Sequence, residues 1–351
     1  MREQHQSRRV TQADIARLAG VSQTTVSLVL AGKADAVALA EGTRSAVIDA
    51  ARQLGYVADP AARRLAAGRN NLLGLHTFMP VFPVDLKNPY YPFLVGVEEE
   101  AAAQGHDLIL FTSAPSAGGA REDPLHRLRL ADGCVLIGRH VPVREVSALL
   151  DGGFPVVYIG RREEFGDRLP YVGADYVAAT AALVRYLYGL GHRRILYVRE
   201  TDEAVAARDR EHGFRTAVTE LQVAPPGGGV IRTTGAEVTG DVLRAWLDSG
   251  ITAIIAESTD TLAAARAVRS AADARGLRTP ADFSFALAGE QVARNESDPE
   301  ITGFRSPRRQ MGHEAIRLLV DLLSGERVGK ARRQQLLTCS FLEGETAGPP
   351  P

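Results

Sequence analysis

The chain has 351 residues, of which 45% are hydrophobic and 24% charged, the balance of an ordinary soluble globular protein. This length accommodates two or three domains with sizeable cores, and no stretch approaches the ~20 apolar residues that span a bilayer. The polar start "MREQHQSRRV" lacks the apolar segment of an export signal. We therefore expect a cytoplasmic protein without a membrane partner, with Cys134 and Cys339 as reduced thiols in its core.

The net charge of −1 conceals an asymmetry along the chain. Residues 1–70 carry ten Lys or Arg and six Asp or Glu, whereas the remainder carries 31 basic and 36 acidic residues. A basic end joined to an acidic body favours a polyanionic partner for that end alone. Ordinary solvated surface charge gives the same balance, so the motifs decide between the two interpretations.

Three short helices are predicted in residues 1–58. Thr11 and Asp14 form a pair typical of a capping box, and Gly20 tolerates positive φ at the turn that follows the first helix. Ser22 is placed to cap the second helix, and "GTRSAVIDAARQLGY" predicts a third that ends at Gly55. The expected inner residues are Ile15, Leu18, Ala19, Val26, Val29, Leu30, Val47, Ile48, Ala51 and Leu54. This pattern predicts a helix-turn-helix domain, although an unrelated α-hairpin also fits its first two helices.

Residues 59–70, "DPAARRLAAGRN", predict a further short helix. Asp59 is a suitable N-cap, a proline follows at the first helical position, and Gly68 marks the end. About two turns of helix are unstable alone in water, so the segment would fold on a partner. With Arg63 on phosphates and Leu65 wedged between base pairs, it suits a DNA-binding hinge. The alternative is a charged linker with an incidental leucine.

The head and hinge resemble the LacI/GalR repressor family, through "TQADIARLAGVSQTTVSLVLAGK" and "TRSAVIDAARQLGYVADPAARRLAAGR". The resemblance implies base contacts in the major groove by Gln23, Thr24 and Leu28, and phosphate contacts by Ser22, Thr25 and Ser27. It also implies that Leu65 enters the minor groove at the operator centre. Many family members have an arginine at the position of Leu28, and a leucine cannot bond guanine as an arginine does. The family's usual half-site is therefore not expected.

Residues 71–344 alternate apolar, strand-like runs such as "DLILFTS", "FPVVYIG" and "TAIIAES" with helical stretches. Such alternation predicts a doubly wound α/β fold, with parallel sheets covered by helices on both faces. This stretch is long for one sheet, so two similar lobes with a ligand cleft between them are expected. Residues 345–351, "ETAGPPP", are expected to form a disordered tail.

The same family resemblance extends to this body through "NPYY", "VGAD", "GHRRI" and "PRRQMG". It implies a two-lobed, periplasmic-binding-protein-like effector domain, with chain crossings near residues 175, 305 and 331. The implied effector-binding residues are Tyr90, Tyr91, Asp175, Arg210, Ser258 and Glu290. Ser258 or Asp260 is an uncertain substitute for the family's usual Asn-Asp after the strand "TAIIA". Glu290, in "ALAGE", is an uncertain substitute for the aspartate of the family's usual V-G-F-D. Each of the other four has an alternative: helix-start packing for the tyrosines, a hinge role for Asp175 and a surface position for Arg210.

No catalytic motif, phosphate-binding loop or zinc-ligand spacing appears, so we expect neither an enzyme nor a cofactor or metal. The resemblance implies a homodimer that binds a pseudo-palindromic, double-stranded operator and responds to a small molecule. A carbohydrate is the expected effector, and a purine or nucleoside corepressor is the alternative. Two other classes remain open at this point. A solute-binding transport component needs an export signal, and a sugar-modifying α/β enzyme leaves the first 70 residues without a role.

Overall fold

A computed structural model describes residues 10–30, 39–56, 70–78, 88–112, 125–223, 229–291, 298–325 and 327–351. The chain divides into two compact units, Met1–Asn70 and Asn71–Pro351. Arg63 and Leu65, and with them the expected hinge helix, lie outside the described residues.

The first unit contains the predicted helices α1 (Gln12–Ala19), α2 (Gln23–Leu30) and α3 (Glu41–Gln53). Thr11 and Asp14 form the predicted capping box: each side chain accepts a hydrogen bond from the other's backbone N–H. Gly20 follows α1 with φ of 66°, a left-handed conformation that favours glycine. The Oγ of Ser22 accepts a hydrogen bond from the backbone N–H of Thr25 at 3.1 Å and so caps α2.

The core of this unit differs from expectation at one position. Leu18, expected on the inner face of α1, is 47% exposed, and Ala16 is buried instead. Ile15 is fully buried, so the inner face of α1 is centred on it; Leu18, three positions further on, lies at the edge of that face. The buried residues are Ile15, Ala16, Val26, Val29, Val47, Ala50 and Ala51.

The second unit begins with a six-stranded parallel sheet in the order β11-β5-β4-β3-β1-β2. Its strands are β1 (Leu72–Thr77), β2 (Asp107–Phe111), β3 (Gly133–Ile137), β4 (Val156–Ile159), β5 (Tyr171–Ala174) and β11 (Gln334–Leu337). Helices α5 (Tyr91–Ala103) and α11 (Arg308–Ser324) cover one face, where Val135 and Ile137 of β3 point. Helix α6 (Val143–Asp151) covers the other, where Cys134 and Leu136 point. Burial on both faces explains the continuous apolar run of β3.

The second lobe contains a four-stranded parallel sheet in the order β7-β6-β8-β9. Its strands are β6 (Ile195–Glu200), β7 (Val230–Thr233), β8 (Ala253–Glu257) and β9 (Ser284–Ala288). Helices α7 (Tyr176–Gly189) and α8 (Val205–Glu220) pack on one face, and α9 (Gly240–Asp248) and α10 (Ala263–Asp273) pack on the other. The predicted architecture, a helix-turn-helix head and a two-lobed, doubly wound body, is confirmed.

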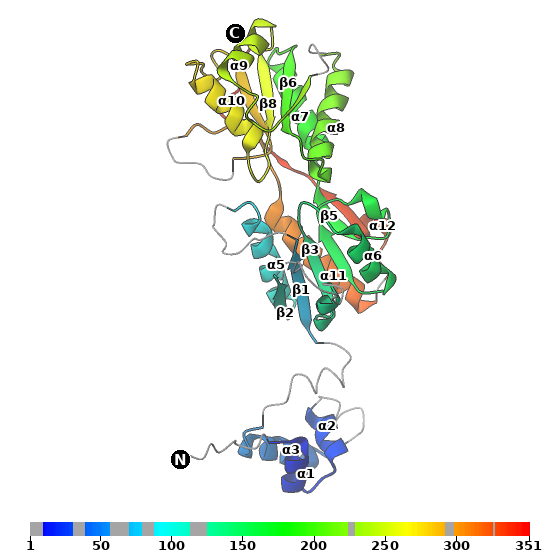
Figure 1. The fold of residues 1–351 in the computed structure, drawn as a ribbon. Helices are drawn as coiled ribbons and strands as arrows, with labels where there is room; N and C mark the ends of the chain where they lie inside the picture. Colours follow the sequence, from blue (N-terminus) through cyan, green and yellow to red (C-terminus); the bar gives the residue numbers. More distant parts are fainter. Residues whose placement is uncertain are drawn as a thin grey trace, which may run out of the picture. The chain divides into compact units, whose positions relative to one another are not determined.

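The chain passes between the two lobes at three places, visible in Figure 1. The first crossing is at Asp175, after β5, and the second runs through β10 (Gly303–Arg305) into α11. The third follows Leu337 and not residue 331, because β11 still pairs with β5 in the first sheet. After it, β12 (Ser340–Leu342) pairs antiparallel with β10.

The last residues of the chain are part of the second lobe. Thr346 is 3% exposed, and its Oγ1 donates a hydrogen bond to the carbonyl of Phe285 in β9 at 2.6 Å. The backbone N–H of Gly348 donates to the Oγ of Ser284 at 3.0 Å. The expectation of a disordered tail at 345–351 is therefore wrong. The segment is anchored by hydrogen bonds, which a sequence with little apolar content does not reveal.

Candidate functional site

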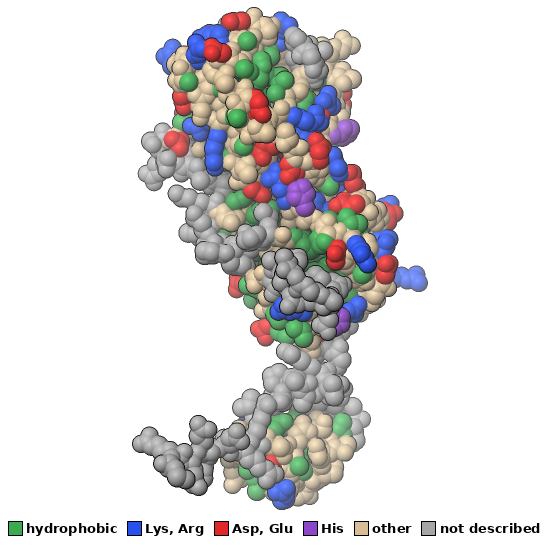
Figure 2. All heavy atoms as spheres, in the orientation of Figure 1, with side chains coloured by type: hydrophobic (Ala, Val, Ile, Leu, Met, Phe, Trp, Pro, Cys, Tyr) green, Lys and Arg blue, Asp and Glu red, His purple; other side chains and the backbone are tan. Residues whose placement is uncertain are grey.

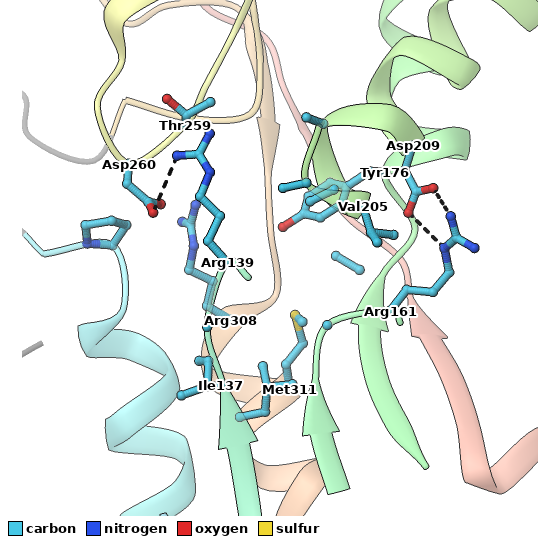
Figure 3. Close-up of a pocket in the computed structure, with 18 of the residues that line it drawn as sticks. Ile137, Arg139, Arg161, Tyr176, Val205, Asp209, Thr259, Asp260, Arg308 and Met311 are labelled. Atoms are coloured by element: carbon cyan, nitrogen blue, oxygen red, sulfur yellow. Dashed lines mark hydrogen bonds and ion pairs between the residues drawn. The ribbon is translucent and has the colours of Figure 1, made fainter. Parts of the chain in front are cut away.

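A pocket in the second unit lies beyond the carboxyl ends of β3, β4 and β8, where the topology predicts a ligand site (Figure 3). About 940 Å³ of empty space lies between its walls, part of it open to solvent. Its side chains come from both lobes. They include Tyr90, Phe93, Ile137, Arg139, Ile159, Arg161, Arg162, Tyr176, Val205, Asp209, Arg210, Glu257, Ser258, Thr259, Asp260, Arg308 and Met311.

Only one member of the predicted aromatic pair lines this pocket. The hydroxyl of Tyr90 donates to Oδ2 of Asp260 at 3.2 Å, and burial, together with that carboxylate, raises the pKa of Tyr90. Tyr91 is half-buried and lies away from the pocket. Phe93, which the sequence analysis missed, takes its place, with its ring 6.1 Å from that of Tyr90. The spacing of three residues at a helix start was the available signal.

Arg210 is 6% exposed, so it is not a surface arginine. Its Nε donates to the carbonyl of Ala288 at 2.8 Å, and its Nη1 donates to the carbonyl of Ala206 at 2.9 Å. The guanidinium lies 3.7 Å from the ring centre of Tyr176. Its Nη2 makes no hydrogen bond with the described residues, which leaves a donor for a ligand in the pocket.

The other predicted effector residues have different positions. Asp175 lies outside this pocket, and its Oδ1 accepts from the backbone N–H of Ala178 at 2.9 Å, which caps α7 at the first crossing. Ser258 lines the pocket, but its hydroxyl donates to the carbonyl of Glu290 at 2.8 Å. Glu290 does not line the pocket. Its carboxylate forms an ion pair with Arg308, and Arg308 does line it.

Several charged lining residues were missed by the sequence analysis. They are Arg139, Arg161, Arg162, Asp209, Glu257 and Arg308; Asp260, the predicted alternative to Ser258 at the family's Asn-Asp position, also lines the pocket. Most of them directly follow strands, in "VLIGR", "VYIGRR" and "IIAES". The strand ends themselves were therefore the signal, because such ends converge on the cleft.

Ion pairs connect the two lobes across this pocket. Arg139, which follows β3, has its Nε 2.9 Å from Oδ2 of Asp202 in the second lobe. Arg161, which follows β4, donates from Nε to Oδ2 of Asp209 in α8 at 3.0 Å (Figure 3). Charged side chains of both signs gather where the lobes meet (Figure 2). The cleft is thus held by pairs that each join one lobe to the other.

Glu257, at the end of β8, is fully buried. Its Oε2 accepts from the backbone N–H of Glu200 at 2.9 Å, whereas Oε1 has no hydrogen-bond partner among the described residues. Burial raises the pKa of Glu257 despite the nearby positive charge of Arg210. This carboxyl group is therefore a buried polar group at the wall of the pocket, with unused hydrogen-bonding capacity on one oxygen.

In the first unit, α2 exposes the residues expected to contact DNA. Ser22, Gln23 and Thr24 are exposed, and Thr25, Ser27 and Leu28 are half-buried. Val26 and Val29 are buried against the other helices and fix the rotation of α2 about its axis. The accessible surface is therefore the polar first turn, the end with which a recognition helix enters the major groove.

Among the described residues, no group of histidine, cysteine or acidic side chains is arranged to hold a metal ion. In the same part of the chain, no helix combines the length and apolar character needed to cross a membrane.

Comparisons with known proteins agree with both units. Residues 11–59 match the family of bacterial regulatory proteins, lacI family, and residues 184–346 match the periplasmic binding protein-like domain. The HTH-type transcriptional regulator reg1 of Streptomyces lividans is 30% identical over 338 residues, which cover 89% of this chain and 90% of that relative.

Two solved structures resemble the whole chain. A transcriptional regulator CelR–cellobiose complex is 26% identical, with a TM-score of 0.63, and covers 97% of this chain and 100% of that one. The lac repressor dimer bound to operator and the anti-inducer ONPF is 22% identical, with a TM-score of 0.71 and the same coverage, which shows a common fold.

Proposed function

Because the chain belongs to the LacI family of bacterial transcriptional regulators, we propose that it is a repressor whose affinity for operator DNA is controlled by a bound sugar. One observation carries the proposal. A single chain combines a helix-turn-helix with an exposed polar helix start and a pocket, lined from both lobes, at the ends of parallel strands. The similar lac repressor was solved on its operator and the similar CelR with cellobiose, which supports both partners.

The head contacts DNA through α2. Gln23 and Thr24 bond base edges in the major groove, and Leu28 contacts a thymine methyl group. The three hydroxyls of Ser22, Thr25 and Ser27 bond phosphates and set the orientation of the helix. The hinge adds Arg63 on phosphates and Leu65 in the minor groove.

Two heads are needed for tight, specific binding. One eight-residue recognition helix reads only a half-site. In a homodimer, the second head binds at a high effective concentration once the first has docked, so affinity rises without new kinds of contact. The similar lac repressor is a dimer on its operator, which supports this arrangement. The operator is accordingly pseudo-palindromic.

The sugar occupies the pocket between the lobes. Tyr90 and Phe93 offer aromatic surface to its C–H face, and the free Nη2 of Arg210 bonds its oxygen atoms. Because the pocket has walls from both lobes, a ligand binds one relative position of the lobes more tightly than another. Operator affinity then changes by the ratio of the ligand's affinities for the two positions.

Selection of genomic fragments on the purified protein, followed by footprinting, tests the proposal. We expect a protected pseudo-palindrome that is bound despite excess unrelated DNA. Gln23→Ala should weaken binding to it at least about tenfold, since one base contact contributes about 1–3 kcal/mol. Ser45→Ala is the matched control, because Ser45 is an exposed head residue outside α2. Equal affinity for the fragment and for bulk competitor would contradict the proposal.

A further inference from the structure

The pocket has an unusual set of positive charges. Five arginines line it, and three of them are paired with carboxylates: Arg139 with Asp202, Arg161 with Asp209 and Arg308 with Glu290. Each of these three pairs joins one lobe to the other. Among the described residues, Arg162 and Arg210 form no ion pair.

Arg162 is 6% exposed and its bonds are all to neutral groups. Its Nη2 donates to the carbonyls of Gly138 at 2.6 Å and Arg139 at 3.0 Å, and to the hydroxyl of Tyr158 at 2.9 Å. The guanidinium lies 4.4 Å from the ring centre of Tyr158. Nε is buried without a hydrogen-bond partner among the described residues, and Nη1 makes no hydrogen bond with them either. The side chain is thus held in place while its charge stays uncompensated.

Arg210, on the second lobe, repeats this pattern, because both of its bonds are to carbonyl oxygens. The acid that influences it electrostatically is Glu257, whose burial favours the neutral form. Glu257 forms no ion pair with Arg210 in the described part of the chain, and its Oε1 has no hydrogen-bond partner there. Three buried polar side chains therefore line the pocket with unused bonding capacity, and two of them are guanidinium groups without an ion pair among the described residues.

A guanidinium does not lose its proton in a protein, so burial cannot neutralise these two charges. Burying an ionised group without a counter-charge is costly, whereas a carboxylate or phosphate meets a guanidinium in strong, charge-assisted hydrogen bonds. A neutral sugar fills the hydrogen-bonding sites but leaves both charges unpaired. Building on the proposed function, we infer that the effector is an anionic sugar, whose carboxylate or phosphate binds Arg162 and Arg210.

Thermal unfolding of the full-length protein tests this inference with matched probes. D-Glucose, D-glucuronate, D-glucose 6-phosphate and inorganic phosphate are each titrated at constant ionic strength set with chloride. We expect at least one of the anions to raise the melting temperature saturably, and glucose to have no such effect. The glucuronate and phosphate arms identify which anionic group is recognised. The inference is overturned if glucose stabilises as much as its charged derivatives, or if no anion exceeds chloride.

A variant pair locates the effect in the pocket. Arg162→Gln should raise the anion concentration at half-effect at least about tenfold, as expected for a lost charge-assisted bond. Arg168→Gln, which removes a surface arginine of the same lobe that is paired with Asp151, should leave it unchanged. An unchanged response in Arg162→Gln would contradict the assignment. The wild-type comparison of glucose with its anions stands independently of whether Arg162→Gln folds.

Operator binding by the same samples distinguishes a failure of the anionic effector from a failure of the repressor function. A protein that binds its footprinted operator but fails the anion test overturns the charged effector and leaves the repressor function standing. A protein that binds anions but no operator contradicts the repressor function itself.

Discussion

Glu257 has an environment very different from that of a solvated acid. It is fully buried, and its hydrogen bond from the N–H of Glu200 and the charges of Arg210 and Arg199 only partly offset the loss of solvation. The pKa of Glu257 in the folded state is therefore raised above its ordinary value of 4.5. In the unfolded chain this carboxyl returns to that value.

Glu257 should make stability fall as the pH rises. Between its ordinary and its raised pKa, the folded state holds a proton that the unfolded state has lost, so the free energy of unfolding decreases through that window. Glu257→Gln cannot ionise, so it should gain stability over the wild type above the window, with a smaller difference near pH 4.5. Urea denaturation of both proteins over this pH range measures the difference in their free energies of unfolding. Glu220→Gln, which changes an exposed acid paired with Arg185, is the control. A gap between Glu257→Gln and wild type that is independent of pH would contradict the assignment.

The short helices of the head depend on their packing more than on their own propensity. Helix α2 has eight residues, too few for stability alone, and Val26 and Val29 dock it onto the other helices. The predicted hinge helix, residues 59–70, has only one large apolar side chain, Leu65. A helix of this sequence has too little apolar surface to form a hydrophobic core of its own.

Leu65→Ala should therefore affect DNA binding and spare the fold. Loss of the wedge that opens the base step should weaken operator binding at least about tenfold, since the bent DNA that such an apolar wedge stabilises allows further contacts with the protein. The melting temperature should stay within about 1 °C of the wild type, because Leu65 is proposed to pack on DNA and not in a protein core, and substitutions outside a core alter stability little. Fluorescence anisotropy on the footprinted operator measures the DNA affinity, and calorimetry measures the melting temperature. Operator affinity equal to that of the wild type would rule out the minor-groove role.

At the scale of the effector unit, the two lobes are joined by charge as well as by three chain crossings. Arg161 approaches Asp209 with two nitrogen atoms, and Asp209 is 6% exposed. Partly buried, bidentate pairs are stronger than surface pairs. The relative position of the lobes is therefore sensitive to any ligand that competes for these arginines.

A double-mutant cycle on Arg161 and Asp209 measures this connection. Arg161→Ala and Asp209→Ala should each destabilise the protein, and the double variant should be less destabilised than the sum of the two. The expected coupling is about 1–3 kcal/mol in the free energy of unfolding. The exposed pair Arg168 and Asp151, treated the same way, should show less than about 1 kcal/mol. Additive effects at Arg161 and Asp209 would mean that the ion pair does not tie the lobes.

The sequence predicted those features that depend on local pattern. Continuous apolar strands such as β3 indicated parallel sheets buried on both faces, and sheet topology then located the pocket. Arg210 was identified from a motif, and it lines the pocket. Local pattern also misled at Leu18, because an eight-residue helix has too few positions to define its buried edge.

Features that depend on residues far apart in the chain were not predictable. The pairing of Arg161 with Asp209 follows from the approach of the two lobes, which no local period reports. The same holds for the order of the last residues, which rests on hydrogen bonds of Thr346 to β9. It also holds for the charge balance around Arg162, because only the assembled pocket reveals which arginines have an acid partner.

The central claim is that paired heads recognise DNA specifically while the body binds an effector that changes this recognition. The most direct measurement is the affinity of the full-length protein for its footprinted operator, for one isolated half-site and for unrelated DNA at a fixed salt concentration. We expect the protein to bind its operator at least about 10³-fold more tightly than unrelated DNA. Its affinity for the half-site should be much closer to that for unrelated DNA. Its affinity for the operator should change when a pocket ligand is added. Equal affinities for all three duplexes, or an operator affinity that no pocket ligand alters, would contradict it.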